Sequence, residues 1–132
     1  MTVTAAPTGP QAYSEQYAAI GPAARQARDD AELILMIWHM DSLIYRVKQV
    51  VSELMANVVE QRTVKKVEMQ LIRTLLGVRV SVTDSCNKLP VAQSAAPTDE
   101  DGRGLVLVGA LSDDWGCDPL PVGKRVWADL HL

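Results

Sequence analysis

Cysteine is scarce in this chain of 132 residues, where only Cys86 and Cys117 occur. The two cysteines form no Cys-x-x-Cys motif, and neither has a histidine at the spacing typical of zinc ligands. A disulfide framework and a zinc site are therefore not expected. Sparse, unpaired cysteines fit a reducing compartment, and we predict a cytoplasmic protein.

Long apolar runs and clusters of basic charge are also missing. The apolar stretch 33–38 is far too short to cross a bilayer, and the N-terminus lacks the basic segment and apolar core of a secretory signal. Lysine and arginine number 13 against 16 acidic residues, so the net charge is −3, and the basic residues are scattered. We therefore expect neither a membrane nor nucleic acid as a direct partner.

Length and composition predict one globular domain. A chain of 132 residues with 48% hydrophobic residues can bury one core but is too short for two ordinary domains. Residues 1–10 are rich in threonine, alanine, proline and glycine and have little to bury, so we expect a flexible tail there. The single domain then spans residues 11–132.

The first half of that domain shows helical spacing. Residues 13–20 fit a short edge strand, after which a proline at a first helical position and regularly spaced apolar residues predict a helix over about 22–38. Asp41 or Ser42 can cap a second helix. The apolar stripe expected on that helix is Leu43, Val47, Val50, Val51, Leu54, Met55 and Val58.

The second half alternates in a way that favours strands. Residues 64–74 and 78–82 predict one hairpin, and residues 115–119 and 125–131 predict another that closes the domain. Between the two hairpins, residues 104–112 read as a third helix. Helices and antiparallel strands in this order indicate an α+β fold, a two-layer sandwich with helices on one face of a mixed or antiparallel sheet.

Three polar residues stand out as candidates for chemistry. Glu53 and Asn57 are four residues apart on the second helix, so both can face one ligand. Their oxygens suit Mg²⁺, and the Glu53 carboxylate could also act as a base. Asp84 closes the strand of the first hairpin. Taken singly, Glu53 and Asn57 are more typical of a solvated helix face, and Asp84 is more typical of a turn at a strand end.

A glycine pair precedes the third helix. Gly102 and Gly104 lead into the apolar run 105–108, which would leave free backbone N–H groups at a helix N-terminus, where a phosphate is favoured. A lone Gly-x-Gly usually means only a tight turn. The motif acquires a functional meaning only together with the other candidates.

Three blocks in this order resemble the histidine-kinase-like ATPases, the Bergerat-fold or GHKL family. Residues 51–57 look like the helical N box, residues 80–85 like the G1 box, and residues 102–108 like the G2 box. Within the family, the chain is similar to the small anti-sigma-factor serine kinases and their actinobacterial regulatory relatives. The resemblance covers about 20–132, and it implies a two-layer α/β sandwich of the Bergerat type.

The resemblance also implies an ATP and Mg²⁺ site with defined roles. By it, Glu53 would be the catalytic base, Asn57 would hold Mg²⁺ against the phosphates, and Asp84 would accept a hydrogen bond from the adenine amino group. The backbone of Gly102, Arg103, Gly104 and Leu105 would wrap the phosphates, and residues 87–101 would form the ATP lid. The partner would be a sigma factor or an anti-sigma antagonist, controlled by serine phosphorylation or by nucleotide-dependent binding.

The chain departs from the family pattern at several positions. Gln61 stands where a histidine is expected, Cys86 and Lys88 replace glycines of the G1 box, and Arg125 replaces a threonine near adenine. Arg125 could block the adenine pocket or stack on the base. A serine/threonine kinase, a weak ATPase and a non-catalytic interaction module with a degenerate nucleotide pocket therefore all stay open. Met36, Trp38 and Met40 suggest an apolar surface that would allow a homodimer or an interface with a partner.

Overall fold

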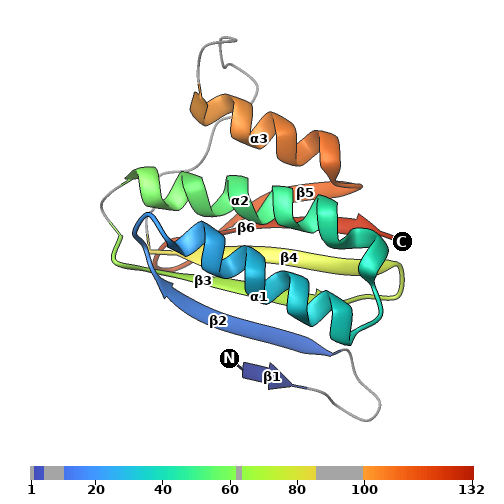
Figure 1. Cartoon of the computed structure of the whole chain (residues 1–132). Coiled ribbons are helices and arrows are strands. Elements are labelled where there is room, and N and C mark those ends of the chain that lie inside the picture. Colours follow the sequence, from blue (N-terminus) through green and yellow to red (C-terminus); the bar gives the residue numbers. More distant parts are fainter. Residues whose placement is uncertain (1, 5–10, 62–63, 86–99) are drawn as a thin grey trace.

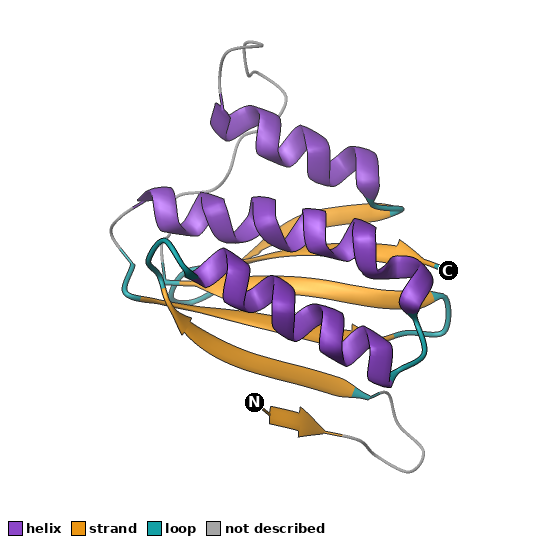
Figure 2. Cartoon of the chain, in the orientation of Figure 1, coloured by secondary structure: helices purple, strands orange, loops and turns teal. Residues whose placement is uncertain are grey.

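A computed structural model describes residues 2–4, 11–61, 64–85 and 100–132 of the chain. In these residues, α1 (Ala23–Ile37), α2 (Ile44–Gln61) and α3 (Glu100–Leu111) lie on one face of a sheet (Figures 1 and 2). The strands are β1 (Thr2–Thr4), β2 (Ala12–Ala18), β3 (Lys66–Arg73), β4 (Gly77–Asp84), β5 (Asp114–Pro119) and β6 (Lys124–His131). Every neighbouring pair is antiparallel, in the order β1-β2-β3-β4-β6-β5. The predicted α+β sandwich, with helices on one face, is confirmed.

The first two helices form as their apolar spacing predicts. Helix α1 follows Pro22 and buries Ala23, Ala27, Ala31, Ile34 and Leu35 against the sheet and α2. A short 3-10 turn, η1 (Asp41–Leu43), precedes α2. All seven residues of the predicted apolar stripe are buried. The core is therefore built largely from local helical patterns that were readable in the sequence.

The β3–β4 and β5–β6 hairpins are also confirmed. In β4, Val78, Val80 and Val82 are buried, whereas Arg79 and Thr83 are partly exposed. Because side chains alternate along a strand, the valines face the helix layer and Arg79 and Thr83 face the other side of the sheet. Asp84 shares the inward face with the valines.

The N-terminal prediction needs two corrections. Strand β2 is not an edge strand, because Thr2–Thr4 pairs with it antiparallel as β1. The expected flexible tail is therefore wrong for Thr2–Thr4, whose backbone pairs with β2 as a strand. Residues 1 and 5–10 lie outside the described residues.

The outer face of the sheet carries a polar and aromatic cluster. The guanidinium of Arg79 lies 4.2 Å from the ring centre of Trp127 and donates to both carboxylate oxygens of Asp129 at 2.7 and 2.8 Å. Trp127 is directly opposite Gly116 on β5, and a Cβ at Gly116 would meet the indole at 2.7 Å. The cluster lies on the face of the sheet opposite the three described helices, and it gives the edge strand β5 side-chain contacts beyond its backbone pairing.

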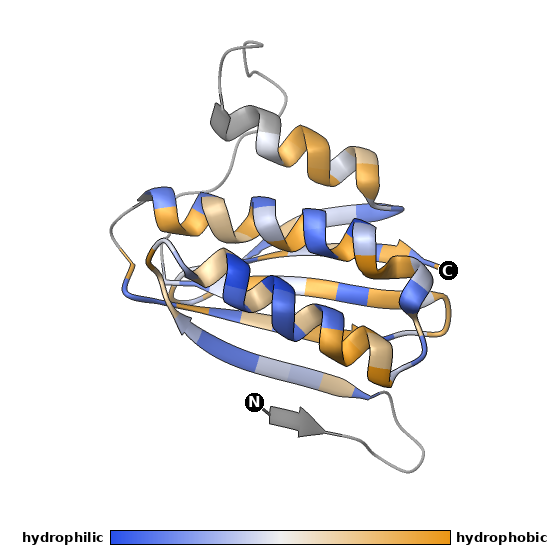
Figure 3. Cartoon of the chain, viewed as in Figure 1, coloured by the Kyte–Doolittle hydropathy of each residue, from blue (hydrophilic) through white to orange (hydrophobic). Residues whose placement is uncertain are grey.

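An apolar stretch lies exposed near the end of α1. Leu33, Met36 and Ile37 are 44–53% exposed, and the C-terminal half of α1 is strongly apolar in Figure 3. Trp38 and Met40, by contrast, are buried in the core at 2% and 3% exposure. The predicted apolar surface is therefore wrong for those two residues and correct for Met36. Among the described residues, the helices are too short or too polar to span a membrane.

A chain of hydrogen bonds joins two tyrosines of β2 to each other and, through Tyr17, to α1. The Tyr17 hydroxyl donates to Oδ2 of Asp30 at 2.6 Å, and the hydroxyl oxygens of Tyr13 and Tyr17 are 3.5 Å apart. Burial raises the pKa of Tyr13 to about 12 from an ordinary value of 10.0, and burial together with Asp30 raises the pKa of Tyr17 as well. Both phenols are therefore protonated in the native protein at neutral pH.

These shifts predict a specific sensitivity to alkali. A pKa raised on folding means that the native state holds the proton more tightly, so the stabilisation is complete below pH 10.0 and is lost as the pH rises towards about 12. We expect tyrosinate absorbance to show late ionisation of Tyr13 and Tyr17, and we expect Tyr13→Phe to remove only the part that belongs to Tyr13. Ionisation of all three tyrosines in one step near their ordinary pKa would contradict this assignment.

Candidate functional site

The three sequence blocks meet at one end of the molecule. Strand β4 ends there at Asp84, α2 ends there at Gln61, and α3 begins there at Glu100 (Figure 1). Strand β6 starts at the same end, because Lys124 pairs with Asp84. The antiparallel course of the elements therefore brings together residues that are far apart in the sequence, such as Asp84 and Lys124, which are 40 positions apart.

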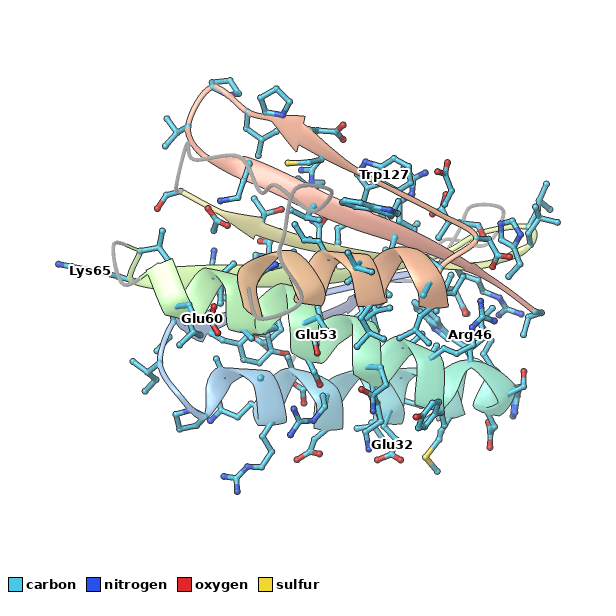
Figure 4. All side chains as sticks on the ribbon, turned by 90° about the horizontal axis from the view of Figure 1, so that it is seen from above. Glu32, Arg46, Glu53, Glu60, Lys65 and Trp127 are labelled. Carbon is cyan, nitrogen blue, oxygen red and sulfur yellow. The ribbon has the colours of Figure 1, made fainter. Side chains whose placement is uncertain are left out.

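Glu53 and Asn57 face α3 from α2. A Cβ placed on Gly104 would lie 2.9 Å from Oε2 of Glu53 and 3.7 Å from Oδ1 of Asn57. Glycine at this position thus lets the two helices approach so closely that the polar oxygens lie against the α3 backbone. Figure 4 shows Glu53 midway along α2, between Arg46 and Glu60. The structure confirms that Glu53, Asn57 and Gly104 come together.

Helix α3 begins earlier than predicted. The expected start was Gly104, but the helix runs from Glu100 to Leu111. Gly102 and Gly104 therefore lie inside its first turns and do not form a turn ahead of it. The backbone N–H groups without an intrahelical partner are those of residues 100–103, so an N-terminal anion site would be centred on these groups. The Leu105 side chain is buried in the core at 1% exposure.

Arg46 fixes the other end of α3. Its guanidinium donates to the carbonyl of Leu111 at 3.0 and 3.1 Å, to the carbonyl of His131 at 3.1 Å, and to the Asp113 carboxylate at 3.1 Å. Asp113 also accepts from the His131 backbone N–H, and this bond, together with Arg46, lowers the pKa of the Asp113 carboxyl. A cation at the carbonyl end of α3 complements the helix dipole. Arg46 therefore holds α3 at the distance from α2 that Gly104 permits.

Asp84 forms a buried ion pair with Lys124. The ammonium nitrogen is 3.2 Å from each carboxylate oxygen, and the two side chains are only 1% and 3% exposed. Lys124 shares the inward face of β6 with Val126, Ala128 and Leu130, which are all buried. The carboxylate predicted to meet adenine is thus in contact with a cation supplied by the neighbouring strand.

Arg125 lies on the opposite face from Asp84. It pairs with Thr83, and its Nε is 3.4 Å from the Thr83 hydroxyl oxygen on the outer side of the sheet. The expectation that Arg125 blocks the adenine pocket or stacks on the base is therefore wrong. Alternation along β6 places Lys124 on the inward face and turns Arg125 away.

Several predicted features lie outside the described parts of the chain. These are Cys86, Lys88 and most of the proposed lid, while the last two lid positions, Glu100 and Asp101, belong to α3. Side-chain positions are likewise not described for Gln61 and Arg103. Their assignments remain predictions. Cys117 is a free thiol whose pKa is raised by burial, so at neutral pH it is not a reactive nucleophile.

The donor set suits magnesium held jointly with a phosphate ligand. The described residues contain no group of three or more His, Cys, Asp or Glu side chains that could hold a metal ion. Glu53 and Asn57 supply one carboxylate and one amide oxygen on the same helix face. Mg²⁺ commonly uses one or two protein oxygens together with substrate phosphates and water, so this sparse set fits it.

A shallow hollow elsewhere on the sheet is unrelated to these residues. It is lined by Ala12, Tyr13, Ser14, Gln70 and Ile72 of β2 and β3. None of the predicted site residues contributes to its walls. The functional candidates therefore belong to the α2–α3 side of the molecule.

The helices on one face of an antiparallel sheet define an α+β sandwich, and a polar contact between α2 and α3 lies within it. The sequence model of the histidine kinase-like ATPase domain family matches residues 18–129. The chain belongs to this family. A comparison with curated proteins found no match. Membership in an ATPase family supports ATP binding, and its members usually bind ATP with Mg²⁺.

Lys124 and Arg46 were not identified as site residues from the sequence. The sequence did contain a signal for Lys124. Val126, Ala128 and Leu130 alternate along the strand, and the position two residues before Val126 on the same face is Lys124. No comparable signal marked Arg46, because all three of its partners lie at least 65 residues away along the chain.

Proposed function

We propose that this protein is a Mg-ATP-binding regulator of the anti-sigma-factor serine kinase type. The observation that carries the proposal is the meeting of Glu53 and Asn57 with the Gly104 backbone, within a domain of the histidine kinase-like ATPase family. Asn57 would hold Mg²⁺, and the first turn of α3 would face the phosphates. Bound Mg-ATP would supply the phosphoryl group and neutralise its charge.

Glu53 would serve as the general base in this proposal. Its carboxylate lies against α3, on the same helix face as Asn57, so a proton acceptor and a metal ligand are held by one rigid element. Glu53 would take the proton from the attacking hydroxyl of a partner serine, or from water. The same site would thus support a serine/threonine kinase or a weak ATPase.

The partner in this proposal is a protein of the bacterial transcription machinery, either a sigma factor or an anti-sigma antagonist. Control would follow from phosphorylation of the partner or from nucleotide-dependent binding, in the cytoplasm. The exposed apolar residues Leu33, Met36 and Ile37 offer a surface for this partner or for a second copy of the chain. Neither nucleic acid nor a membrane enters the proposal.

Calorimetric titration with ATP, with and without Mg²⁺, tests the site. Asn57→Ala is expected to weaken Mg-ATP binding at least about tenfold and to abolish the benefit of magnesium, because it removes the amide ligand. Gln49→Ala, on the same helix, is the matched control and should bind as the wild type does. Equal affinity in the Asn57 variant and the wild type would refute the site assignment.

The Asp84–Lys124 pair favours a second candidate, a non-catalytic interaction module. A carboxylate already bonded to a buried ammonium is a poorer acceptor for a base amino group than an uncommitted one. The assay that separates the two candidates is phosphate transfer from labelled ATP to a purified partner. Transfer that disappears in Glu53→Gln would support the kinase, whereas partner binding without any transfer would support the module.

Gly104→Ala should lower Mg-ATP affinity without lowering the stability of the protein. The new methyl group would come within 2.9 Å of Oε2 of Glu53 and push that flexible carboxylate aside. Alanine also favours the helix by up to about 1 kcal/mol, so the protein should be equally or more stable. We expect Mg-ATP affinity to fall about threefold to tenfold.

The control for this variant is Gly109→Ala on the same helix, whose methyl group would meet Trp115 instead of Glu53. Thermal unfolding and calorimetry on both variants provide the comparison. Equal ATP affinity in the Gly104 variant and the wild type would show that the close approach of α3 to Glu53 is irrelevant to binding.

A further inference from the structure

The inward faces of β4 and β6 carry one carboxylate and one ammonium in register. Asp84 and Lys124 are direct cross-strand partners, and the Lys124 nitrogen is 3.2 Å from both carboxylate oxygens. The neighbouring inward residues Val82 and Val126 are buried and apolar. The pair therefore lies in a low-dielectric environment, where a charge-assisted contact is strong.

The backbone beside the pair is fixed by Gly123. This residue has a φ of +86°, and a Cβ on it would lie 1.8 Å from the carbonyl oxygen of Asp84. The β5–β6 turn thus packs directly against the end of β4. Lys124 follows immediately, so its backbone is held in place and the ammonium is presented to the carboxylate by the sheet itself.

A nucleobase that uses Asp84 must compete with Lys124. The amino group of adenine is a neutral donor, and hydrogen bonds from neutral donors are roughly half as strong as those from charged ones. Moving the ammonium away would also separate two buried charges, which is unfavourable. The intact pair therefore opposes recognition of adenine at this carboxylate.

We infer that Lys124 determines base selectivity by occupying Asp84, so that the wild-type protein binds nucleoside triphosphates through their phosphates with little preference for adenine. This inference rests on the proposed nucleotide site. It assigns phosphate binding to the α2–α3 side of the molecule. Lys124 is then the residue that prevents Asp84 from recognising the nucleobase. Without the ammonium, the Asp84 carboxylate would be a better acceptor for the adenine amino group.

The first test compares ATP and GTP on the wild-type chain by calorimetry in the presence of Mg²⁺. Because the two nucleotides share their phosphates and ribose, their affinities are expected to agree within about threefold. A preference for ATP greater than tenfold would show that Asp84 reads adenine despite Lys124, and would overturn the inference while leaving the proposed ATP site intact.

The second test uses Lys124→Thr with Arg125→Thr as its matched control. Both variants lose one positive charge at adjacent positions, but only Lys124 faces Asp84, since Arg125 lies on the outer face. Lys124→Thr is expected to gain about tenfold in affinity for ATP over GTP, equal to about 1.4 kcal/mol. Arg125→Thr is expected to show no such gain.

The outcomes separate the inference from the function on which it rests. No gain in Lys124→Thr, with ATP still bound by the wild type, overturns the role of Lys124 alone. Absence of binding of either nucleotide by the wild type and by Lys124→Thr overturns both proposals. If far-UV circular dichroism shows that Lys124→Thr does not fold, the wild-type comparison of ATP and GTP decides the question by itself.

Discussion

Replacing Gly123 with alanine is expected to lower the free energy of unfolding by roughly 3–5 kcal/mol. Two penalties combine. The residue has a φ of +86°, which is unfavourable for any side chain, and the new Cβ would lie 1.8 Å from the carbonyl oxygen of Asp84 and 2.6 Å from the Cα of Ser85. Both atoms belong to the backbone, so neither can rotate out of the way as a flexible side chain could.

Denaturant unfolding with Gly21→Ala as the control would measure this effect. Gly21 has nothing within 4 Å of the position of its missing Cβ. Alanine there should change stability by less than about 1 kcal/mol. Similar losses in the two variants would mean that the β5–β6 turn does not press against the end of β4.

The same contact connects stability to function. A shift of the turn would move Lys124, the next residue, away from its register with Asp84. Gly123→Ala should therefore disturb the ion pair as well as the backbone. This coupling explains why the strongest backbone constraint among the described glycines lies beside the carboxylate predicted to meet the base.

The two long helices were predictable because their signal is local. Apolar residues at intervals of three and four define the buried stripes of α1 and α2 without reference to the rest of the chain. The buried residues Val47, Leu54 and Val58 lie where that spacing puts them. Glu53 and Asn57 could likewise be assigned to one helix face from their spacing alone.

The start of α3 was not predictable on the same grounds. Residues 100–103 are polar, and Gly102 and Gly104 have low helix propensity, which favours a turn over a helix. Tertiary contacts then hold the helix: Leu105 and Val108 are buried, and Arg46 anchors the other end.

The partner of Asp84 depends on long-range pairing. Sequence alternation predicts which residues of β6 face inward, but not that β6 lies next to β4 or that residue 124 pairs with residue 84. That register is determined by the whole sheet, including the antiparallel β5–β6 hairpin at its edge. The sequence therefore supported a role for Asp84 but could not show that Lys124 would occupy it.

Removing Lys124 is expected to destabilise the domain by about 3–5 kcal/mol, because Lys124→Met leaves the Asp84 carboxylate buried without the ammonium that faces it. The pair is almost fully buried, with 1% and 3% side-chain exposure, so water cannot readily take the place of the cation. Arg125→Met at the next position is the matched control. Arg125 is partly exposed, and its loss should cost less than about 1 kcal/mol.

The double variant Asp84→Leu/Lys124→Met separates two contributions to the free energy of unfolding. One is the net contribution of the ion pair, and the other is the cost of leaving one buried charge without its partner. Replacing both charges with apolar side chains of similar size is often neutral or even stabilising. We therefore expect the double variant to recover most of the stability lost in Lys124→Met when the two are compared by denaturant unfolding. A double variant as unstable as the single one would show that Lys124 contributes mainly through its packing.

If the double variant recovers the stability lost in Lys124→Met, the ion pair needs an explanation other than folding. A buried ion pair that adds little net stability over apolar residues is not explained by folding alone. Asp84 ends β4 on the side of the sheet where α2 and α3 meet, and Lys124 is the cation held against it. A stable apolar replacement that still binds ATP and GTP equally, beside a Lys124→Thr variant that prefers ATP, would then show that the pair controls recognition of the nucleobase and is not needed for stability.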